Sequence, residues 1–208
     1  MKVRPITPAA LVEELADRIA GRLPDRRLRV AVDGAPVAGP DALAAALVDP
    51  LRVRGRAALR IRSADFLRPG SVRLELGRRD PDSYYLRWLD ESGLRREVLD
   101  RLGPGGTGRV LPSLWNPVTD RATRAGHLTV PPGGVVLVSG GLLLGAGLPF
   151  DLAVHLALSP AALARRTTPA EQWTLPAFAR YEAEVAPARV ADVVVRVDDP
   201  ARPAVVDG

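Results

Sequence analysis

Two glycines, Gly34 and Gly39, follow a short apolar run and precede an alanine-rich segment. Their spacing fits the phosphate-loop pattern G-x-x-x-x-G-K-[ST], in which backbone amides surround a phosphate group. That pattern continues with a lysine that reaches the phosphates and a hydroxyl that binds Mg²⁺. The corresponding positions here are Pro40 and Asp41. The segment therefore has the outline of a phosphate site without its cation or its hydroxyl, and proline removes one backbone N–H.

The composition indicates one globular domain. The chain has 208 residues, of which 47% are hydrophobic, and no apolar run reaches the roughly 18 residues that span a membrane. The net charge is +5, but arginines are spread along the chain among 24 acidic residues, so we expect no nucleic-acid partner. Because the chain has no cysteine and its N-terminus lacks an apolar signal segment, we expect a cytoplasmic protein without a membrane partner.

Apolar patterning predicts strands and helices in alternation, which must position the loop. Short apolar runs predict strands at 28–32, 57–62, 135–138, 152–158 and 191–197. Helical spacing and helix-start signals predict helices at 8–21, 41–48, 81–90, 92–101, 160–166 and 175–185. This alternation is typical of a parallel sheet covered by helices on both faces.

Segments outside this alternation complete the predicted organisation. Residues 1–26 are interpreted as an N-terminal helical extension packed on the main α/β domain, which comprises residues 27–208. Residues 103–134 are rich in Gly, Pro and Thr and are predicted to form a β-hairpin or irregular excursion around 110–115 and 125–130. The residues that follow 197 are predicted to be a tail.

Five stretches of the chain follow one another in the order of a known family. They are "VAVDGAPVAG", "ADFLRP", "DPDSYYLRWLDESGLRREVLDRLGPGG", "GVVLVSGGLLL" and "RYEAEVAPARVADVVVRVDDPARP". Together they resemble the uridine kinase-like nucleoside kinases of the P-loop fold, particularly their short actinobacterial forms. The resemblance implies a three-layer α/β fold with a mostly parallel five-stranded sheet flanked by helices. It also implies a ligand crevice at the carboxyl ends of the strands.

Four positions depart from that family where its chemistry resides. Pro40 replaces the Walker A lysine, and Asp41 replaces the hydroxyl that binds Mg²⁺. Ala64 stands where the family has the acid that accepts the proton of the nucleoside 5′-hydroxyl, and Ser139 stands at the Walker B acid. Asp65, one place after Ala64, is the candidate for a replacement base. Because phosphoryl transfer depends on positioning and charge neutralisation, these changes together predict impaired catalysis.

The same resemblance marks six further candidates for contacts with a nucleoside or with phosphate: Arg68, Arg73, Tyr84, Tyr85, Arg165 and Arg166. The tyrosine pair could line a nucleoside pocket or cap the core, and the first arginine pair could meet a substrate or face solvent. The second arginine pair lies in the region of the family's lid, where arginines contact transferring phosphates. His127 and His155 lack the neighbours of a metal site, so both are interpreted as structural and no metal is predicted.

Three functions remain open at this point. The first is a pseudo-kinase with degenerate Walker A, base and Walker B positions, which acts by binding a nucleotide, a nucleoside or a protein. The alternative is an active ATP-dependent nucleoside kinase or small-molecule phosphotransferase with an arginine-based phosphate site, and only this function would require Mg-ATP. The third is a scaffold subunit whose crevice is filled by side chains such as those of residues 142–144.

Overall fold

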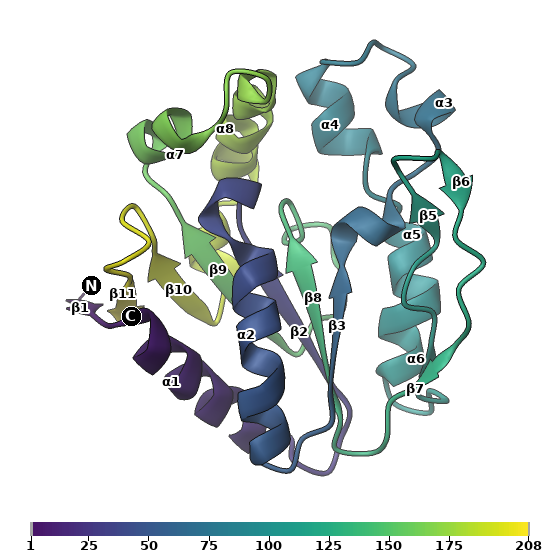
Figure 1. Ribbon diagram of the computed structural model, residues 1–208, viewed down its shortest axis with the longest axis vertical. Coiled ribbons are helices and arrows are strands. Elements are labelled where there is room, and N and C mark those ends of the chain that lie inside the picture. The colour runs from purple at the N-terminus through teal and green to yellow at the C-terminus, as the bar shows by residue number, and fades with distance from the viewer. Residues whose placement is uncertain (1, 208) are drawn as a thin grey trace.

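The computed structural model describes residues 2–207 and contains a central sheet between two layers of helices (Figure 1). In spatial order its strands are β1 (Lys2–Pro5), β11 (Ala204–Asp207), β10 (Val193–Arg196), β9 (Leu152–Ala157), β2 (Leu28–Asp33), β8 (Val135–Gly140) and β3 (Ala58–Arg62). The strands from β10 to β3 run parallel, whereas β11 and β1 pair antiparallel at one edge. The predicted α/β class, three layers and mostly parallel sheet are confirmed.

The helices alternate with these strands along the chain. They are α1 (Pro8–Gly21), α2 (Pro40–Val53), α3 (Gly70–Arg73), α4 (Pro81–Arg87), α5 (Glu91–Leu94), α6 (Asp100–Leu102), α7 (Pro160–Arg166), α8 (Leu175–Glu184) and α9 (Pro187–Val190). A π-helical turn at Arg95–Leu99 joins α5 to α6, so the predicted helix at 92–101 is one helical segment with a local widening. No helix within residues 2–207 is long and apolar enough to cross a membrane.

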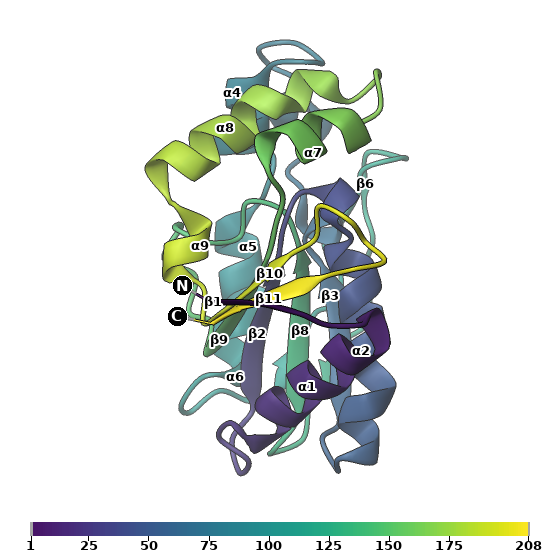
Figure 2. The ribbon, with the colours of Figure 1, turned by 90° about the vertical axis from the view of Figure 1, so that its left-hand side faces the viewer.

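The two faces of the sheet are buried in different apolar clusters. Successive side chains of a strand point to opposite faces, and in β8 Val135 and Leu137 pack with α1 and α2 whereas Val136 and Val138 pack with α5 and α6. Figure 2 shows the helices on either side of the sheet, seen edge-on. This packing fixes the carboxyl ends of β2, β8 and β3, where the phosphate-loop residues lie.

Helix α1 begins and packs as its sequence predicts. The hydroxyl of Thr7 accepts a hydrogen bond from the backbone N–H of Ala10 at 3.2 Å and so caps the helix. Leu11, Leu15 and Ile19 then recur on one face, and all three are buried in the cluster that also contains α2. The N-terminal segment thus shares its core with the sheet.

The sheet has seven strands, so the prediction of five strands and a C-terminal tail is wrong. Val206 pairs with Val194 of β10 on one side and with Val3 of β1 on the other. Each terminal strand has only four residues, too few for a clear alternation signal in the sequence. Pairing between segments some 200 residues apart, which single-sequence patterning does not register, decides their structure.

The excursion at 103–134 contains two small antiparallel ladders. The outer ladder joins β4 (Arg109–Val110) to β7 (Leu128–Thr129), and the inner one joins β5 (Trp115–Asn116) to β6 (Arg121–Ala122). The predicted β-hairpin is therefore present, with each ladder reduced to two residue pairs.

A buried ion pair fixes the start of β2 to the loop before β9. The Arg29 guanidinium donates to both carboxylate oxygens of Asp151, at 2.9 and 2.8 Å, and the Arg29 backbone N–H donates to the same group at 2.9 Å. Both side chains are largely buried. Burial acts to raise the pKa of Asp151, but the hydrogen bonds and charge of Arg29 outweigh it and hold that pKa below its ordinary value.

Replacing this acid by asparagine is expected to lower the free energy of unfolding near neutral pH by about 2 kcal/mol, because Arg29 would lose its counter-charge in a largely buried place. An acid with a lowered folded-state pKa stabilises the fold above its unfolded-state pKa, and this contribution disappears as pH falls through the folded-state value. The difference between wild type and Asp151→Asn should therefore begin to shrink near pH 4, the ordinary pKa of an aspartate, and disappear only below the lowered folded-state pKa. Urea unfolding at several pH values measures it. A difference that is constant with pH would contradict the assignment.

Candidate functional site

The loop after β2 closes on itself before α2 begins. Its N–H groups at Ala38 and Gly39 donate to the carbonyls of Ala35 and Pro36 at 2.7 and 3.1 Å, forming a short 3₁₀ turn. Gly39 has φ +85°, a conformation that favours glycine, and α2 starts at the next residue. The two amides that donate within the turn are not directed at a ligand. The loop therefore has the spacing of a phosphate loop and the hydrogen bonding of a helix-initiating turn.

Pro40 and Asp41 occupy the first turn of α2. Pro40 is buried at the first helical position, where a missing N–H has no intrahelical partner to lose. The Asp41 carboxylate accepts a hydrogen bond of 2.5 Å from the hydroxyl of Ser139, at the end of β8. Two of the positions that depart from the uridine kinase-like pattern thus contact each other. An acid at this end of a helix is also favoured by the helix dipole.

Asp65 does not take the place of the acid that Ala64 replaces. Ala64 and Asp65 both lie in the 3₁₀ turn Ser63–Phe66, but only Ala64 lines a pocket beside the loop. The Asp65 carboxylate instead receives two hydrogen bonds from the Arg62 guanidinium, at 2.9 and 2.7 Å. The candidate base is engaged in an ion pair.

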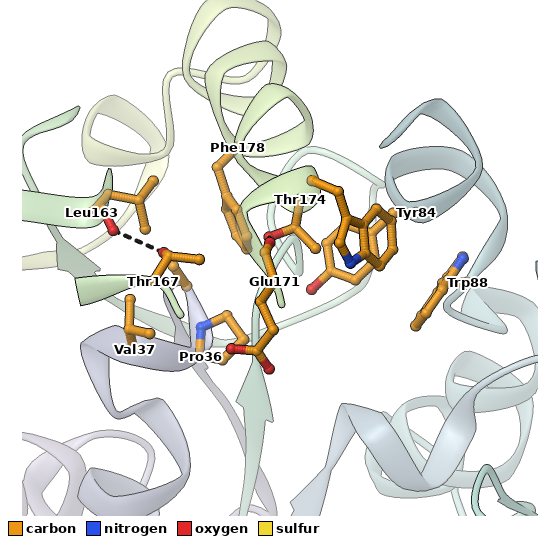
Figure 3. Close-up of a pocket in the computed structure, with 11 residues that line it drawn as sticks. Pro36, Val37, Tyr84, Trp88, Leu163, Thr167, Glu171, Thr174 and Phe178 are labelled. Atoms are coloured by element: carbon orange, nitrogen blue, oxygen red, sulfur yellow. Dashed lines mark hydrogen bonds between the residues drawn. The ribbon is translucent and has the colours of Figure 1, made fainter. Parts of the chain in front are cut away.

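Two adjoining pockets lie at the carboxyl ends of β2, β3 and β8. The first, here called the loop pocket, has a volume of about 280 Å³, and Pro40, Asp41, Ala64 and Tyr85 are among the residues that line it. The second, here called the aromatic pocket, has a volume of about 270 Å³ (Figure 3). The pockets share the side chains of Pro36, Tyr84 and Trp88, and we call the two together the crevice.

The aromatic pocket gathers rings from distant parts of the chain. Tyr84 lies edge-on to Trp88, Trp173 and Phe178, with ring centroids 5.0, 5.5 and 6.1 Å apart. Nine aromatic residues exist in the chain, and these four line one pocket of the crevice while Tyr85 lines the other. Burial, with a smaller contribution from the negative charge of Glu171, raises the pKa of Tyr84 to about 12.

The predicted tyrosine pair therefore lies at the crevice. Sequence spacing does not mark the tryptophans or Phe178 as pocket residues. The signal that could have found Trp173 is an aromatic residue within the polar segment "TTPAEQWTLP", where it has no helical or strand partner nearby. Its proximity to Tyr84 depends on the tertiary fold alone.

The four predicted arginines lie outside the residues that line these pockets. Arg73 is buried, donates to the carbonyl of Arg68 at 2.6 Å and stacks on Trp88 with its guanidinium carbon 5.1 Å from the ring centroid. The expectation that Arg73 faces solvent is therefore wrong. Arg166 donates to the backbone carbonyls of Val37 and Val197, and Arg165 is exposed. The hydrogen bonds of Arg73 and Arg166 hold protein segments together.

A polar network lies at the carboxyl end of β2. The Asp33 carboxylate is fully buried and accepts hydrogen bonds from His155 Nδ1 at 2.7 Å, the Tyr181 hydroxyl at 3.1 Å and the Leu143 N–H at 2.9 Å. Burial and the charge of Asp33 raise the pKa of Tyr181. The structural role predicted for His155 fits these contacts, although the sequence did not reveal its partners.

The residues at 142–144 do not fill the crevice. Leu143 and Leu144 are buried, whereas Leu142 lines the loop pocket. Within residues 2–207, no group of three or more His, Cys, Asp and Glu side chains is arranged to hold a metal ion, and His127 is exposed. The crevice is thus open space with aromatic and acidic walls.

The sheet order, the loop after β2 and the crevice at the strand ends define the fold of the P-loop kinases. A structure of a protein described as a possible uridine kinase from Bacillus stearothermophilus matches 89% of this chain and 97% of its own, with a TM-score of 0.73 and 18% identity. A protein described as a "putative fructose transport system kinase" from Silicibacter sp. TM1040 matches 89% of this chain and 95% of its own, with a TM-score of 0.57 and 24% identity.

These matches confirm the fold that the sequence resemblance implied, the uridine kinase-like P-loop fold. No protein-family model matches the chain, and no curated protein sequence matches it. The fold is therefore shared with kinases, whereas the chemistry has to be argued from the residues in the crevice.

Proposed function

We propose that this protein is a pseudo-kinase, a uridine kinase-like fold whose crevice binds a small molecule without transferring phosphate. The single observation that carries the proposal is the contact between Ser139 and Asp41, the residue that follows Pro40 in α2. It places a carboxylate where the family pattern has a hydroxyl for Mg²⁺, and the adjacent position has no cation.

The electrostatics of this contact oppose a bound polyphosphate. Two like charges about 4 Å apart repel each other by about 4 kcal/mol at an effective dielectric constant of about 20. The missing lysine and acids would each have supplied stabilisation of the transition state, commonly about 3 kcal/mol for one preorganised group. The residues present therefore do not fit Mg-ATP, and the joint change would remove most of the acceleration of phosphoryl transfer.

The arginine-based alternative finds little support in the crevice. Arg166 contacts the loop, but its guanidinium already donates to the carbonyls of Val37 and Val197. Asp65 is held by Arg62. An active kinase would need both side chains to leave these partners.

The test is a phosphorylation assay of the purified protein with Mg-ATP and a panel of nucleosides and sugars, read by separation of the products. An active uridine kinase in the same assay is the positive control. We expect no product above the protein-free background and no rise in melting temperature with Mg-ATP. Phosphorylation of any panel member at a rate typical of an enzyme, about 1 s⁻¹ or more, would establish the alternative instead.

A further inference from the structure

The charged side chains that line the crevice are all acidic. They are Asp41 and Glu91 in the loop pocket and Glu171 in the aromatic pocket. No Arg, Lys or His side chain described by the structure lines either pocket, although the chain has 29 Lys and Arg residues and a net charge of +5. The crevice thus has the opposite charge to the chain as a whole.

We propose that the crevice binds a small organic cation, with a substituted ammonium group held against the aromatic rings and the Glu171 carboxylate. This inference rests on the proposed function, in which phosphate binding has been lost. It specifies the chemical class of the ligand that replaces a phosphorylated one.

The aromatic pocket supplies the contacts that such a cation requires. A cation within about 6 Å of an aromatic centroid is attracted by the negative face of the ring, most strongly by tryptophan. Tyr84 and Trp173 meet nearly edge to face, at 79°, so their rings face different directions around the pocket. Because Arg73 already stacks on Trp88, we expect the ligand cation against Tyr84 and Trp173.

Glu171 provides the counter-charge. Figure 3 shows its side chain extending into the pocket toward Pro36, with the Tyr84 and Trp88 rings to one side. One of its oxygens accepts a hydrogen bond from the Thr168 hydroxyl at 3.0 Å, which restrains the carboxylate. The pKa of Tyr84 is raised by burial and, to a smaller extent, by the negative charge of Glu171, because both disfavour an ionised tyrosine in this pocket.

The remaining two acids extend the negative potential into the loop pocket. Glu91 is partly buried; burial raises its pKa, while the positive charge of Arg68 acts in the opposite direction. Asp41 is bonded to Ser139. A ligand that reaches from the aromatic pocket into the loop pocket would therefore place a polar or second cationic group beside these carboxylates, and an anionic group there would be repelled.

The probes are choline and its neutral isostere 3,3-dimethyl-1-butanol, here called dimethylbutanol, in which a carbon atom replaces the nitrogen. Trp88 and Trp173 line the pocket and report binding by fluorescence, and Trp115→Phe removes the signal of the third tryptophan, which lies on β5. We expect saturable binding of choline that is at least about tenfold tighter than that of dimethylbutanol. Equal affinities, or no saturable choline signal, would overturn the proposal.

Two variants test whether the Glu171 carboxylate itself attracts the cation. Glu171→Gln in the Trp115→Phe background should weaken choline binding about fivefold and leave dimethylbutanol binding unchanged. Asp49→Asn, an equal loss of charge on an exposed side chain of α2, should change neither. An unchanged choline affinity in Glu171→Gln would contradict the assigned counter-charge. Mg-ATP is titrated in parallel. Binding of Mg-ATP with phosphorylation counts against the proposed function. If neither Mg-ATP nor choline binds, this inference alone is contradicted.

Discussion

Replacing Asp33 by alanine is expected to lower the free energy of unfolding by at least about 4 kcal/mol, the largest effect on stability that we predict at any single site near the crevice. The carboxylate is fully buried and accepts three hydrogen bonds, from His155, Tyr181 and the Leu143 N–H. Removing it leaves each of those donors without its partner, and an unpaired buried polar group costs about 1 to 3 kcal/mol. Urea unfolding followed by circular dichroism measures the change.

Two further variants make that result interpretable. Asp49→Ala removes an acid whose side chain is 87% exposed, and it should change stability by less than about 0.5 kcal/mol. Tyr181→Phe removes one of the three donors to Asp33 and also the acceptor of the Leu144 N–H, and it should give an intermediate loss of about 2 kcal/mol. If Asp33→Ala lost no more stability than Tyr181→Phe, the three donors would not act as one network.

Restoring the phosphate-loop residues is expected to create affinity for Mg-ATP. The double variant Pro40→Lys/Asp41→Ser adds a cation and removes an anion at the loop, a change of two charges within a few ångströms of a bound polyphosphate. Each change is worth up to about 4 kcal/mol at an effective dielectric constant of about 20, and closing the loop around a ligand costs part of this gain. We therefore expect Mg-ATP to bind at least about 30-fold more tightly than to the wild type, as measured by calorimetry.

The same helix provides a matched control for this experiment. Asp49 and Pro50, near the end of α2, carry the same two residue types, so Asp49→Ser/Pro50→Lys makes identical exchanges away from the loop. That variant should not bind Mg-ATP more tightly than the wild type. If both double variants gained equally, the effect would come from net charge, and the loop would have no residual preference for phosphate.

Much of the fold could be predicted from the sequence because its signals are local. Strands β2, β8 and β9 are mostly buried apolar runs, and Thr7 and Pro8 mark the start of α1 at the residue where it begins. The terminal strands could not be predicted in this way. A four-residue segment such as Ala204–Asp207 becomes a strand only because β10 and β1 lie beside it.

The crevice likewise contains residues that sequence spacing reveals and residues that only the tertiary packing brings together. The loop glycines and the departures at Pro40 and Asp41 are visible as spacing, and Pro40 and Asp41 line the loop pocket. By contrast, Trp173 reaches Tyr84 because the 3₁₀ turn that precedes α8 packs against α4, and Asp33 meets Tyr181 across 148 positions of sequence. Spacing along the chain carries no information on such contacts, because they depend on how the layers pack.

The pairing of β1 with β11 determines how the molecule would respond to mechanical load. Lys2 lies opposite Asp207, so the two ends of the described chain meet at the same end of one antiparallel ladder, as the adjacent N and C marks in Figure 2 show. A force that separates these ends would break the hydrogen bonds of this ladder one after another, instead of shearing them all at once. The outer edge would therefore peel at low force, while the parallel strands that hold the crevice remain paired.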